Sequence, residues 1–254
     1  MKRVLFLLMS VLAVAAAFTS CKKDKENAYT VKLLKTVTYY SNRYEETYNR
    51  YKFEYDKQNR IAKISDYYTR TITYDGDDLV QVVTTNNDGY IGTCQYIKNG
   101  NTITFTEKYI YNGDNYTNTY TIELDSDGLP VKQEVERSDN VNYFHVYEYQ
   151  DGNLATDRIT YDTSREDNTE THTYTYDNEK SALYYCQTPK WYLILYLNDF
   201  GISNNVTYSG GTYPPRSSYT YEYDVTGFPV KRTCQTSGYM QHSEGIEYFT
   251  YIKK

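Results

Sequence analysis

A short phrase that recurs along the chain constrains its fold most strongly. Each copy alternates aromatic and polar residues, continues through a turn of Asp, Asn and Gly, and returns as a short aliphatic stretch that often ends in Lys. Alternation with period two is typical of a β-strand, and an Asp/Asn-Gly turn supplies the positive φ that a tight hairpin needs. Each copy therefore predicts a β-hairpin. The copies are residues 51–64, 71–83, 96–106, 119–132, 143–152, 171–177 and 218–231.

The turn residues recur with a spacing of about 25 residues. They are Asp56, Asp75, Asn99, Asp125, Asp151, Asp177 and Asp224, with gaps of 19, 24, 26, 26, 26 and 47. Because the last gap is close to two units, one degenerate copy is expected between residues 178 and 217. A unit this short holds two strands, about half of a propeller blade. We therefore expect an all-β fold, an antiparallel meander of hairpins curling into an open, barrel-like sheet.

Tyrosine dominates the aromatic residues, with 34 Tyr against 8 Phe and one Trp. Tyr and Thr suit a pleated surface that is apolar on its body and polar at its tip. A membrane-spanning barrel would instead need an outward apolar band about 25 Å tall, bordered by aromatic residues. Here Thr, Glu and Lys alternate with Tyr along whole strands. The sheet is therefore expected to be soluble and not membrane-spanning.

The start of the chain predicts export and lipidation. A positively charged start precedes an apolar run over residues 4–18, and small polar residues then lead to Cys21. This layout is typical of a bacterial lipoprotein signal, with lipid attached to Cys21. A lone membrane-spanning helix is disfavoured because it needs about 18 to 20 apolar residues. The expected organisation is a signal peptide (1–20), a lipidated tether (21–28) and one β-repeat domain (29–254), anchored in the outer membrane and facing the periplasm or the cell surface.

The charge balance argues against nucleic acid as a partner. The chain has 27 Lys and Arg against 33 Asp and Glu, a net charge of −6. Removing residues 1–20 takes away Lys2 and Arg3 and no acid, which gives −6 − 2 = −8. A chain of this charge, without a Lys/Arg stripe, repels phosphate backbones.

The cysteines carry no metal or redox motif. With Cys21 assigned to lipid, Cys94, Cys186 and Cys234 remain, and no CxxC is present. Neither a zinc site nor a thioredoxin-type pair is therefore predicted. One disulfide with a leftover thiol and three inert core thiols are both compatible with the spacing.

Histidines and acidic turns offer no stronger site. His145, His172 and His242 lack metal-binding spacing and are interpreted as exposed strand residues. Residues 75–78 (DGDD) and 125–128 (DSDG) contain pieces of a calcium loop but are interpreted as hairpin turns. No metal and no cofactor is expected.

Rows of tyrosine are the best candidates for a binding surface. Tyr219, Tyr221 and Tyr223 share one face of their strand because successive side chains alternate. Exposed rows suit sugar rings or protein surfaces, whereas buried rows would form the core of a thin sheet. The candidate ligand-binding residues are Tyr147, Tyr174, Trp191 and Tyr221.

Residues 185–206 interrupt the repeat. The single tryptophan, Trp191, opens the apolar run WYLILY. A core plug that closes the open end of the sheet, as a short helix or a buried strand, is the favoured interpretation. An aromatic platform at the rim is the functional alternative, and the strand order within 178–217 stays open.

Two features together resemble a known family. Residues 20–24 (SCKKD) are similar to the lipidation site of Bacteroidota lipoproteins, and units such as 221–231 (YEYDVTGFPVK) resemble YD/RHS-type repeats. The chain thus resembles a Bacteroidota lipoprotein family of unknown function with a porin-like β-fold, and residues 195–206 resemble the non-repeat insert of such proteins. Over about residues 30–254, the resemblance implies a curved antiparallel sheet and no established activity.

These observations predict a lipid-anchored protein of the cell envelope that is not an enzyme, since no nucleophile–base or metal constellation stands out. Its expected partners are the membrane, through Cys21, and a glycan or an envelope protein. The favoured function is a non-catalytic binding module; the alternative is a structural scaffold without a small ligand. Exposed tyrosines on the concave face, such as a pair formed by Tyr147 and Tyr221, would favour the module, and buried ones the scaffold.

Overall fold

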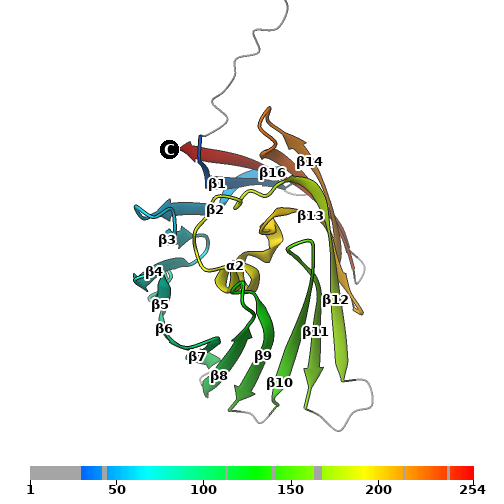
Figure 1. Cartoon of the computed structure of the whole chain (residues 1–254). Helices are drawn as coiled ribbons and strands as arrows, with labels where there is room; N and C mark the ends of the chain where they lie inside the picture. Colours follow the sequence, from blue (N-terminus) through cyan, green and yellow to red (C-terminus); the bar gives the residue numbers. More distant parts are fainter. Residues whose placement is uncertain are drawn as a thin grey trace, which may run out of the picture. The chain divides into compact units, whose positions relative to one another are not determined.

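A closed β-barrel forms the described part of the chain (Figure 1). The computed structural model describes residues 30–41, 45–111, 114–138, 141–162, 168–213, 215–238 and 241–254. In these residues, sixteen strands follow one another around the barrel in sequence order, and every pair is antiparallel. The expected all-β antiparallel meander is confirmed.

The strands are β1 (Lys32–Ser41), β2 (Glu46–Tyr55), β3 (Ile61–Ser65), β4 (Thr69–Asp75), β5 (Asp78–Thr85), β6 (Ile91–Asn99), β7 (Thr102–Tyr111), β8 (Asp114–Leu124), β9 (Pro130–Arg137), β10 (Tyr143–Gln150), β11 (Asn153–Tyr161), β12 (Thr169–Lys180), β13 (Asn204–Gly211), β14 (Arg216–Tyr223), β15 (Pro229–Gly238) and β16 (Gln241–Lys253). A short helix, α2 (Lys190–Leu197), and a 3₁₀ turn, η1 (Asn198–Phe200), lie between β12 and β13. No helix among the described residues is long and apolar enough to cross a membrane.

The sheet is closed, whereas an open sheet was expected. The ladder between β1 and β16 runs from the pair Lys32 and Lys253 to the pair Ser41 and Gly245. Twisted strands curl a long meander until its first and last edges meet, and closure then satisfies the backbone groups that both edges would expose. The pairing of strands more than 200 residues apart is invisible to a local pattern.

In three units, the repeated Asp builds the turn. One carboxylate oxygen of Asp56 accepts the backbone N–H of residues 58 and 60 at 2.9 and 3.0 Å. Asp125 accepts those of residues 127 and 129 at 2.8 and 2.9 Å, and Asp224 those of residues 226 and 228 at 2.8 and 3.2 Å. These are Asx-type turns, which explains the Asp at this place in the repeat. The turn at Asp125, one of two considered as a calcium loop, uses its carboxylate in this way.

Tyrosines of the repeat join neighbouring units. The hydroxyls of Tyr74, Tyr149, Tyr176 and Tyr251 donate to the backbone carbonyls of Ile61, Pro130, Leu154 and Pro229 at 2.7 to 2.8 Å. Each acceptor is the first or second residue of an earlier strand. An inward tyrosine thus packs its ring in the barrel and satisfies a backbone carbonyl with its hydroxyl. This part of the tyrosine excess is structural.

The wide gap between Asp177 and Asp224 holds an insertion, and its described residues do not contain the degenerate hairpin copy expected there. Residues 181–203, which are 23 residues, separate β12 from β13. The gap of 47 minus 23 leaves 24, the ordinary spacing of the repeat. One unit has therefore been enlarged at its turn, and its second strand, β13, follows the insertion.

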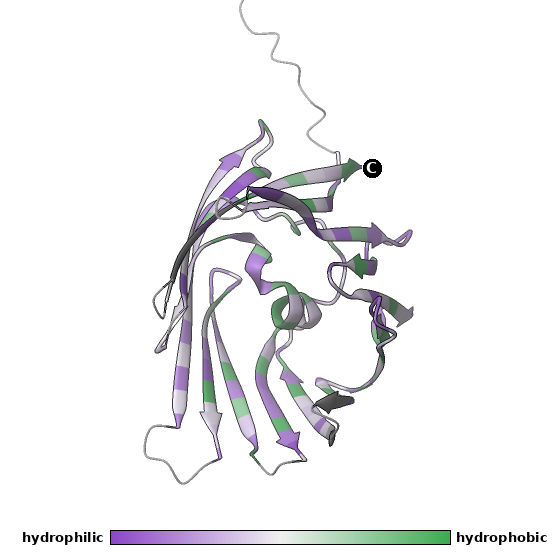
Figure 2. Cartoon of the chain, turned by 180° about the vertical axis from the view of Figure 1, so that it is seen from behind, coloured by the Kyte–Doolittle hydropathy of each residue, from purple (hydrophilic) through white to green (hydrophobic). Residues whose placement is uncertain are grey.

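The insertion carries α2, which lies inside the ring of strands (Figures 1 and 2). Its sequence, KWYLILYL, is apolar on all sides, and such a helix is stable only when apolar surroundings enclose it. Trp191 is buried, with its ring centroid 5.3 Å from that of Tyr96 on the barrel wall. Leu193 and Leu197 join the same core as residues from β1 to β8. The helix is a core plug, as favoured from the sequence.

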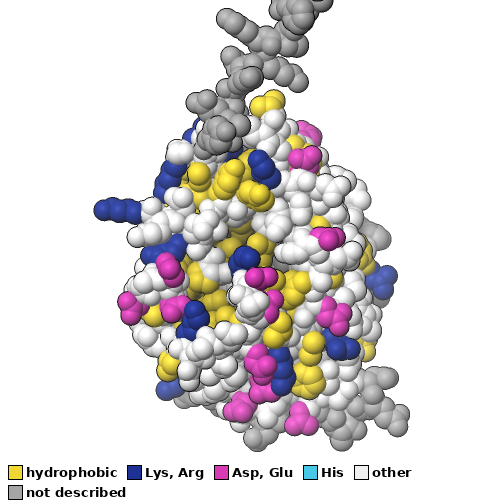
Figure 3. Space-filling view, viewed as in Figure 1, with side chains coloured by type: hydrophobic (Ala, Val, Ile, Leu, Met, Phe, Trp, Pro, Cys, Tyr) yellow, Lys and Arg dark blue, Asp and Glu magenta, His cyan; other side chains and the backbone are white. Residues whose placement is uncertain are grey.

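The strands place tyrosine inward and polar residues outward. Along β14, Ser217, Tyr219, Tyr221 and Tyr223 are half-buried, while the alternating Arg, Ser, Thr and Glu are exposed. The row of three tyrosines therefore shares one face, the inner one. On the face seen in Figure 3, charged side chains of both signs are interspersed with other polar groups around apolar ones.

The two ends of the barrel differ. The Asp turns lie at one end, where the backbone of Val31 exchanges hydrogen bonds with Lys254. The described N-terminal end of β1 is therefore at this turn end. The described connections at the opposite end include residues 66–68, between β3 and β4, and residues 86–90, between β5 and β6.

Candidate functional site

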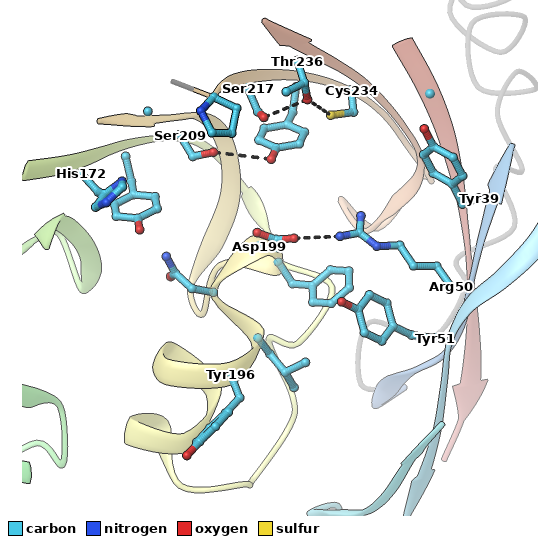
Figure 4. A pocket seen from close by; sticks show the side chains of 18 of the residues that line it. Tyr39, Arg50, Tyr51, His172, Tyr196, Asp199, Ser209, Ser217, Cys234 and Thr236 are labelled. Atoms are coloured by element: carbon cyan, nitrogen blue, oxygen red, sulfur yellow. Dashed lines mark hydrogen bonds and ion pairs between the residues drawn. The ribbon is translucent and has the colours of Figure 1, made fainter. Parts of the chain in front are cut away.

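A large cavity lies inside the barrel, between the plug and the strand ends opposite the Asp turns. Its volume is about 740 Å³. Its walls come from strands on both sides of the β1–β16 closure and its floor from α2 and η1 (Figure 4). We call it the main cavity. Residues that line it include Tyr39, Tyr48, Arg50, Tyr51, His172, Tyr174, Tyr196, Asp199, Ser209, Ser217, Tyr219 and Thr236.

Aromatic rings form one side of the main cavity. Tyr39 of β1 and Tyr48 of β2 lie with ring centroids 5.4 Å apart, and Tyr51 packs edge-on against Phe200 of η1 at 5.5 Å. Tyr196 of α2 is 44 % exposed although its helix is inside the barrel, so its accessible surface faces the cavity. These flat rings can stack on a ligand at low entropic cost.

Hydroxyl groups form the opposite side. Ser217 of β14 and Thr236 of β15 are cross-strand partners with oxygens 3.0 Å apart. The hydroxyl of Thr236 is also 3.4 Å from Cys234 Sγ, and Ser209 of β13 lies 3.5 Å from the Tyr219 hydroxyl (Figure 4). Hydroxyl groups both donate and accept hydrogen bonds, so this wall can match the hydroxyls of a polar ligand.

A network of charged groups joins the plug to the wall. Arg50 of β2 binds Glu247 of β16 and, at 3.1 Å, Asp199 of η1. Arg232 of β15 binds Glu247 at 2.5 Å and donates to the Asp199 carbonyl at 2.6 Å. Burial disfavours the charge on Arg50, but Glu247 and Asp199 outweigh burial and raise its pKa. Opposite charges balance within the network, so the main cavity has no strong excess of either sign.

A second cavity, of about 340 Å³, adjoins the main one on the side of β7 to β12. We call it the side chamber. The two share Tyr174, Leu195, Tyr196 and Asn198 in their linings. The other residues lining the side chamber are Glu107, Tyr120, Gln133, His145, Tyr147, Leu154, Asp157 and Ile194.

The four candidate ligand-binding residues have different surroundings. Tyr174 lines both cavities, and burial raises its pKa to about 12. Tyr147 lines the side chamber but is buried, and its hydroxyl donates to Gln133 Oε1 at 2.7 Å. Trp191 is in the core, and Tyr221 donates to the Val206 carbonyl at 2.8 Å; neither lines the two cavities. Tyr147 and Tyr221 therefore do not form an exposed pair.

Other residues considered from the sequence are also placed. His145 and His172 flank Asp157 on neighbouring strands: His145 Nδ1 lies 2.8 Å from Asp157 Oδ1, and His172 is the cross-strand partner of Asp157. Both face cavities, which corrects their interpretation as exposed strand residues.

Cys21 and the side chain of His242 lie outside the described residues. Cys94, Cys186 and Cys234 are free, half-buried thiols.

Sequence reasoning missed several cavity residues. Tyr196 belongs to the segment that breaks the repeat, and that break was the only signal available for it. Gly245 of β16 lies against the ring of Tyr39, where a Cβ atom would overlap the ring. A strand glycine of this kind often marks close approach of another group, but one sequence does not identify that group.

Replacing Gly245 with alanine should therefore push the Tyr39 ring into the main cavity. We expect a loss of affinity for a ligand of this cavity on the order of tenfold, equivalent to about 1.4 kcal/mol, with an overpacking cost of about 1–3 kcal/mol. Titration calorimetry and thermal melting measure the two effects. Adding Tyr39→Leu should restore the melting temperature without restoring affinity. An unchanged affinity in Gly245→Ala would show that Tyr39 does not shape the site.

The fold and cavities define a plugged antiparallel β-barrel with an internal cavity of ligand size. No protein family matches the sequence, and no curated protein sequence is similar to it. Among solved structures, it is similar to the crystal structure of a porin-like protein from Bacteroides uniformis, with a TM-score of 0.51 and 14 % sequence identity over 86 % of this chain and 98 % of that chain. At this identity the likeness shows the fold, and it agrees with the porin-like β-fold that the resemblance implied.

Proposed function

We propose that the protein is a non-catalytic binding module of the bacterial cell envelope, which holds a glycan in the main cavity. The observation that supports this proposal is a cavity of about 740 Å³ in which tyrosine rings on one side face hydroxyl groups on the other. Ligand sites in proteins typically measure about 300–1,000 Å³ and combine apolar walls with a few polar groups. A sugar ring has apolar faces and a hydroxyl-bearing edge, so it suits this combination.

The envelope location is supported by the N-terminus and by the fold neighbour. Cys21 follows a secretion signal with the layout of a lipoprotein, so the tether would hold the barrel to the membrane through lipid. The neighbouring structure is a porin-like protein of Bacteroides uniformis. The outward residues of β14 are Arg216, Ser218, Thr220 and Glu222, a face suited to water.

A structural scaffold remains the second candidate, favoured by the tyrosines that satisfy backbone carbonyls between units, such as Tyr149 and Tyr251. The hydrogen bonds of these hydroxyls stabilise the fold. The tyrosines of the main cavity are different, because Tyr48 and Tyr196 keep much of their surface accessible. Ligand binding therefore depends on a subset of the tyrosine residues.

A glycan screen with matched tyrosine variants tests the proposal. The barrel unit, Val31–Lys254, is compact on its own and contains every described strand, so residues 27–254 can be used. We expect one class of polysaccharide or oligosaccharide to raise the melting temperature saturably. Tyr196→Ala should weaken its binding on the order of tenfold, as expected from losing one stacked ring and about 1.4 kcal/mol.

Tyr184→Ala is the matched control. Tyr184 is 46 % exposed, close to the 44 % of Tyr196, but it lines neither the main cavity nor the side chamber. This variant should bind the glycan as tightly as the parent protein. Equal losses in both variants would place binding outside the cavity, and a flat response of the well-folded protein to the whole panel would favour the scaffold.

A further inference from the structure

The side chamber differs from the main cavity in its charge. Among the described residues, its lining contains two carboxylates, Glu107 of β7 and Asp157 of β11, and neither Lys nor Arg. In the lining of the main cavity, Asp199 is instead paired with Arg50. A ligand that spans both cavities would therefore meet a balanced region and then an acidic one.

Each carboxylate uses one oxygen within the barrel. Glu107 Oε2 accepts the hydroxyl of Tyr120 at 3.0 Å, and Asp157 Oδ1 lies 2.8 Å from His145 Nδ1. The other oxygen of each carboxylate has no hydrogen-bond partner among the described residues. Two acceptors are thus available on side chains that line one small chamber.

Gln133 provides an independent sign of a ligand. Its side chain lines the chamber and is only 8 % exposed. Its Oε1 accepts the Tyr147 hydroxyl at 2.7 Å, whereas its Nε2 has no hydrogen-bond partner in the described part of the chain. The N–H donors of Nε2 are therefore available to an oxygen atom of a ligand in the chamber.

Aromatic rings line the chamber beside the two carboxylates. Tyr120, Tyr147 and Tyr174 all line it, and the faces of tyrosine rings attract cations. The charge of Asp157 acts on the tyrosines of this chamber. After burial, it is the next largest cause of the raised pKa of both Tyr147 and Tyr174. Away from bulk water, a charge pair is screened less than it would be at the surface.

We propose that the side chamber binds an ammonium group of the ligand, so that the glycan is an amino sugar whose free amine pairs with Asp157, while Glu107 adds negative charge to the same chamber. This inference rests on the proposed function, because the sugar body would occupy the main cavity. The ammonium donates to the free oxygen of Asp157, and a neighbouring sugar oxygen accepts from Gln133 Nε2. Tyr174 and Tyr196, which border both cavities, lie where the two parts of the ligand would join.

Two ligands that differ only at nitrogen test the inference. Oligosaccharides of glucosamine carry the ammonium, and those of N-acetylglucosamine replace it with a neutral amide. Titration calorimetry at low and high salt should show at least tenfold tighter binding of the glucosamine form, with a preference that shrinks as salt increases. Ethanolamine tests whether an amine without a sugar is sufficient.

Charge-removing variants of the same size place the effect in the chamber. The double variant Glu107→Gln/Asp157→Asn should lose the preference for the amine while still binding the sugar body. Glu136→Gln/Glu148→Gln removes the same charge from exposed positions and should keep the preference. The single variant Glu107→Gln, with a smaller loss, serves if the double variant does not fold by circular dichroism.

The failures of the two proposals can be told apart. Equal binding of both oligosaccharides, or tighter binding of the acetylated form, overturns the amine assignment and leaves glycan binding in place. Binding of ethanolamine as tight as that of the oligosaccharide overturns the amino-sugar assignment. If the folded protein binds neither oligosaccharide and no other glycan of the screen, the proposed function fails and this inference with it.

Discussion

Replacing Glu247 with alanine should destabilise the barrel by about 3–5 kcal/mol, the usual cost of leaving one member of a buried ion pair uncompensated. Glu247 is 0 % exposed and is the counterion of Arg232, which is 1 % exposed. It also binds Arg50, so its loss leaves two neighbouring cations. Urea unfolding of the variant and the parent protein, followed by circular dichroism, measures the difference.

Two controls identify the cause. Glu222→Ala removes a carboxylate whose ion pair with Lys231, at 2.7 Å, is exposed on the outer face, and it should cost at most about 1 kcal/mol. Glu247→Leu combined with Arg232→Met removes both buried charges and should recover most of the lost stability. A cost for Glu247→Ala as small as that for Glu222→Ala would contradict a buried electrostatic role.

Acid should weaken the barrel through Asp224, between about pH 4 and pH 2. Burial opposes ionisation of this carboxyl, but hydrogen bonds from Lys32, Thr226 and the turn outweigh it and lower its pKa to about 2. Because the folded-state pKa is below the unfolded value, the stabilisation is complete above about pH 4 and is lost as the pH falls through the folded pKa. A shift of this size corresponds to about 2 kcal/mol.

Asp224→Asn tests this dependence. The side chain is 23 % exposed and pairs at 2.8 Å with the buried amine of Lys32, so the neutral variant should be less stable at pH 7 by about 2 kcal/mol. Its stability should approach that of the parent protein near pH 2, where Asp224 itself becomes protonated. Asp127→Asn, at an exposed position of a sister turn, should follow the parent curve. Parallel curves for the parent and Asp224→Asn would contradict the prediction.

The hairpins could be predicted because their causes are local. Each Asp turn closes within five residues, and alternation of Tyr with Thr or Glu is visible along a single strand. The insertion could be located for the same reason, since the run beginning at Trp191 breaks the period. The extra hairpin predicted before Asp224 was wrong because a gap length alone does not distinguish two units from one enlarged unit.

The site could be predicted only in part. Tyr174 lines both cavities, but Trp191 lies in the core and Tyr221 lies in the barrel wall. Tyr174 and Tyr221 are both tyrosines of alternating repeat strands, and one sequence cannot show which of the two rings faces a cavity. The charged network was also out of reach, because Arg50, Asp199, Arg232 and Glu247 come from four separate elements.

The sequence by itself determined the antiparallel hairpin units, the single face that the tyrosines of a strand share and an apolar plug, because these follow from contacts between residues near one another in the chain. Only the tertiary structure decided that the sheet closes, that the plug fills part of the lumen, and that a main cavity and an acidic side chamber remain beside it. The physical reason is that closure and cavity shape depend on the register and curvature summed over sixteen strands, which no single unit encodes.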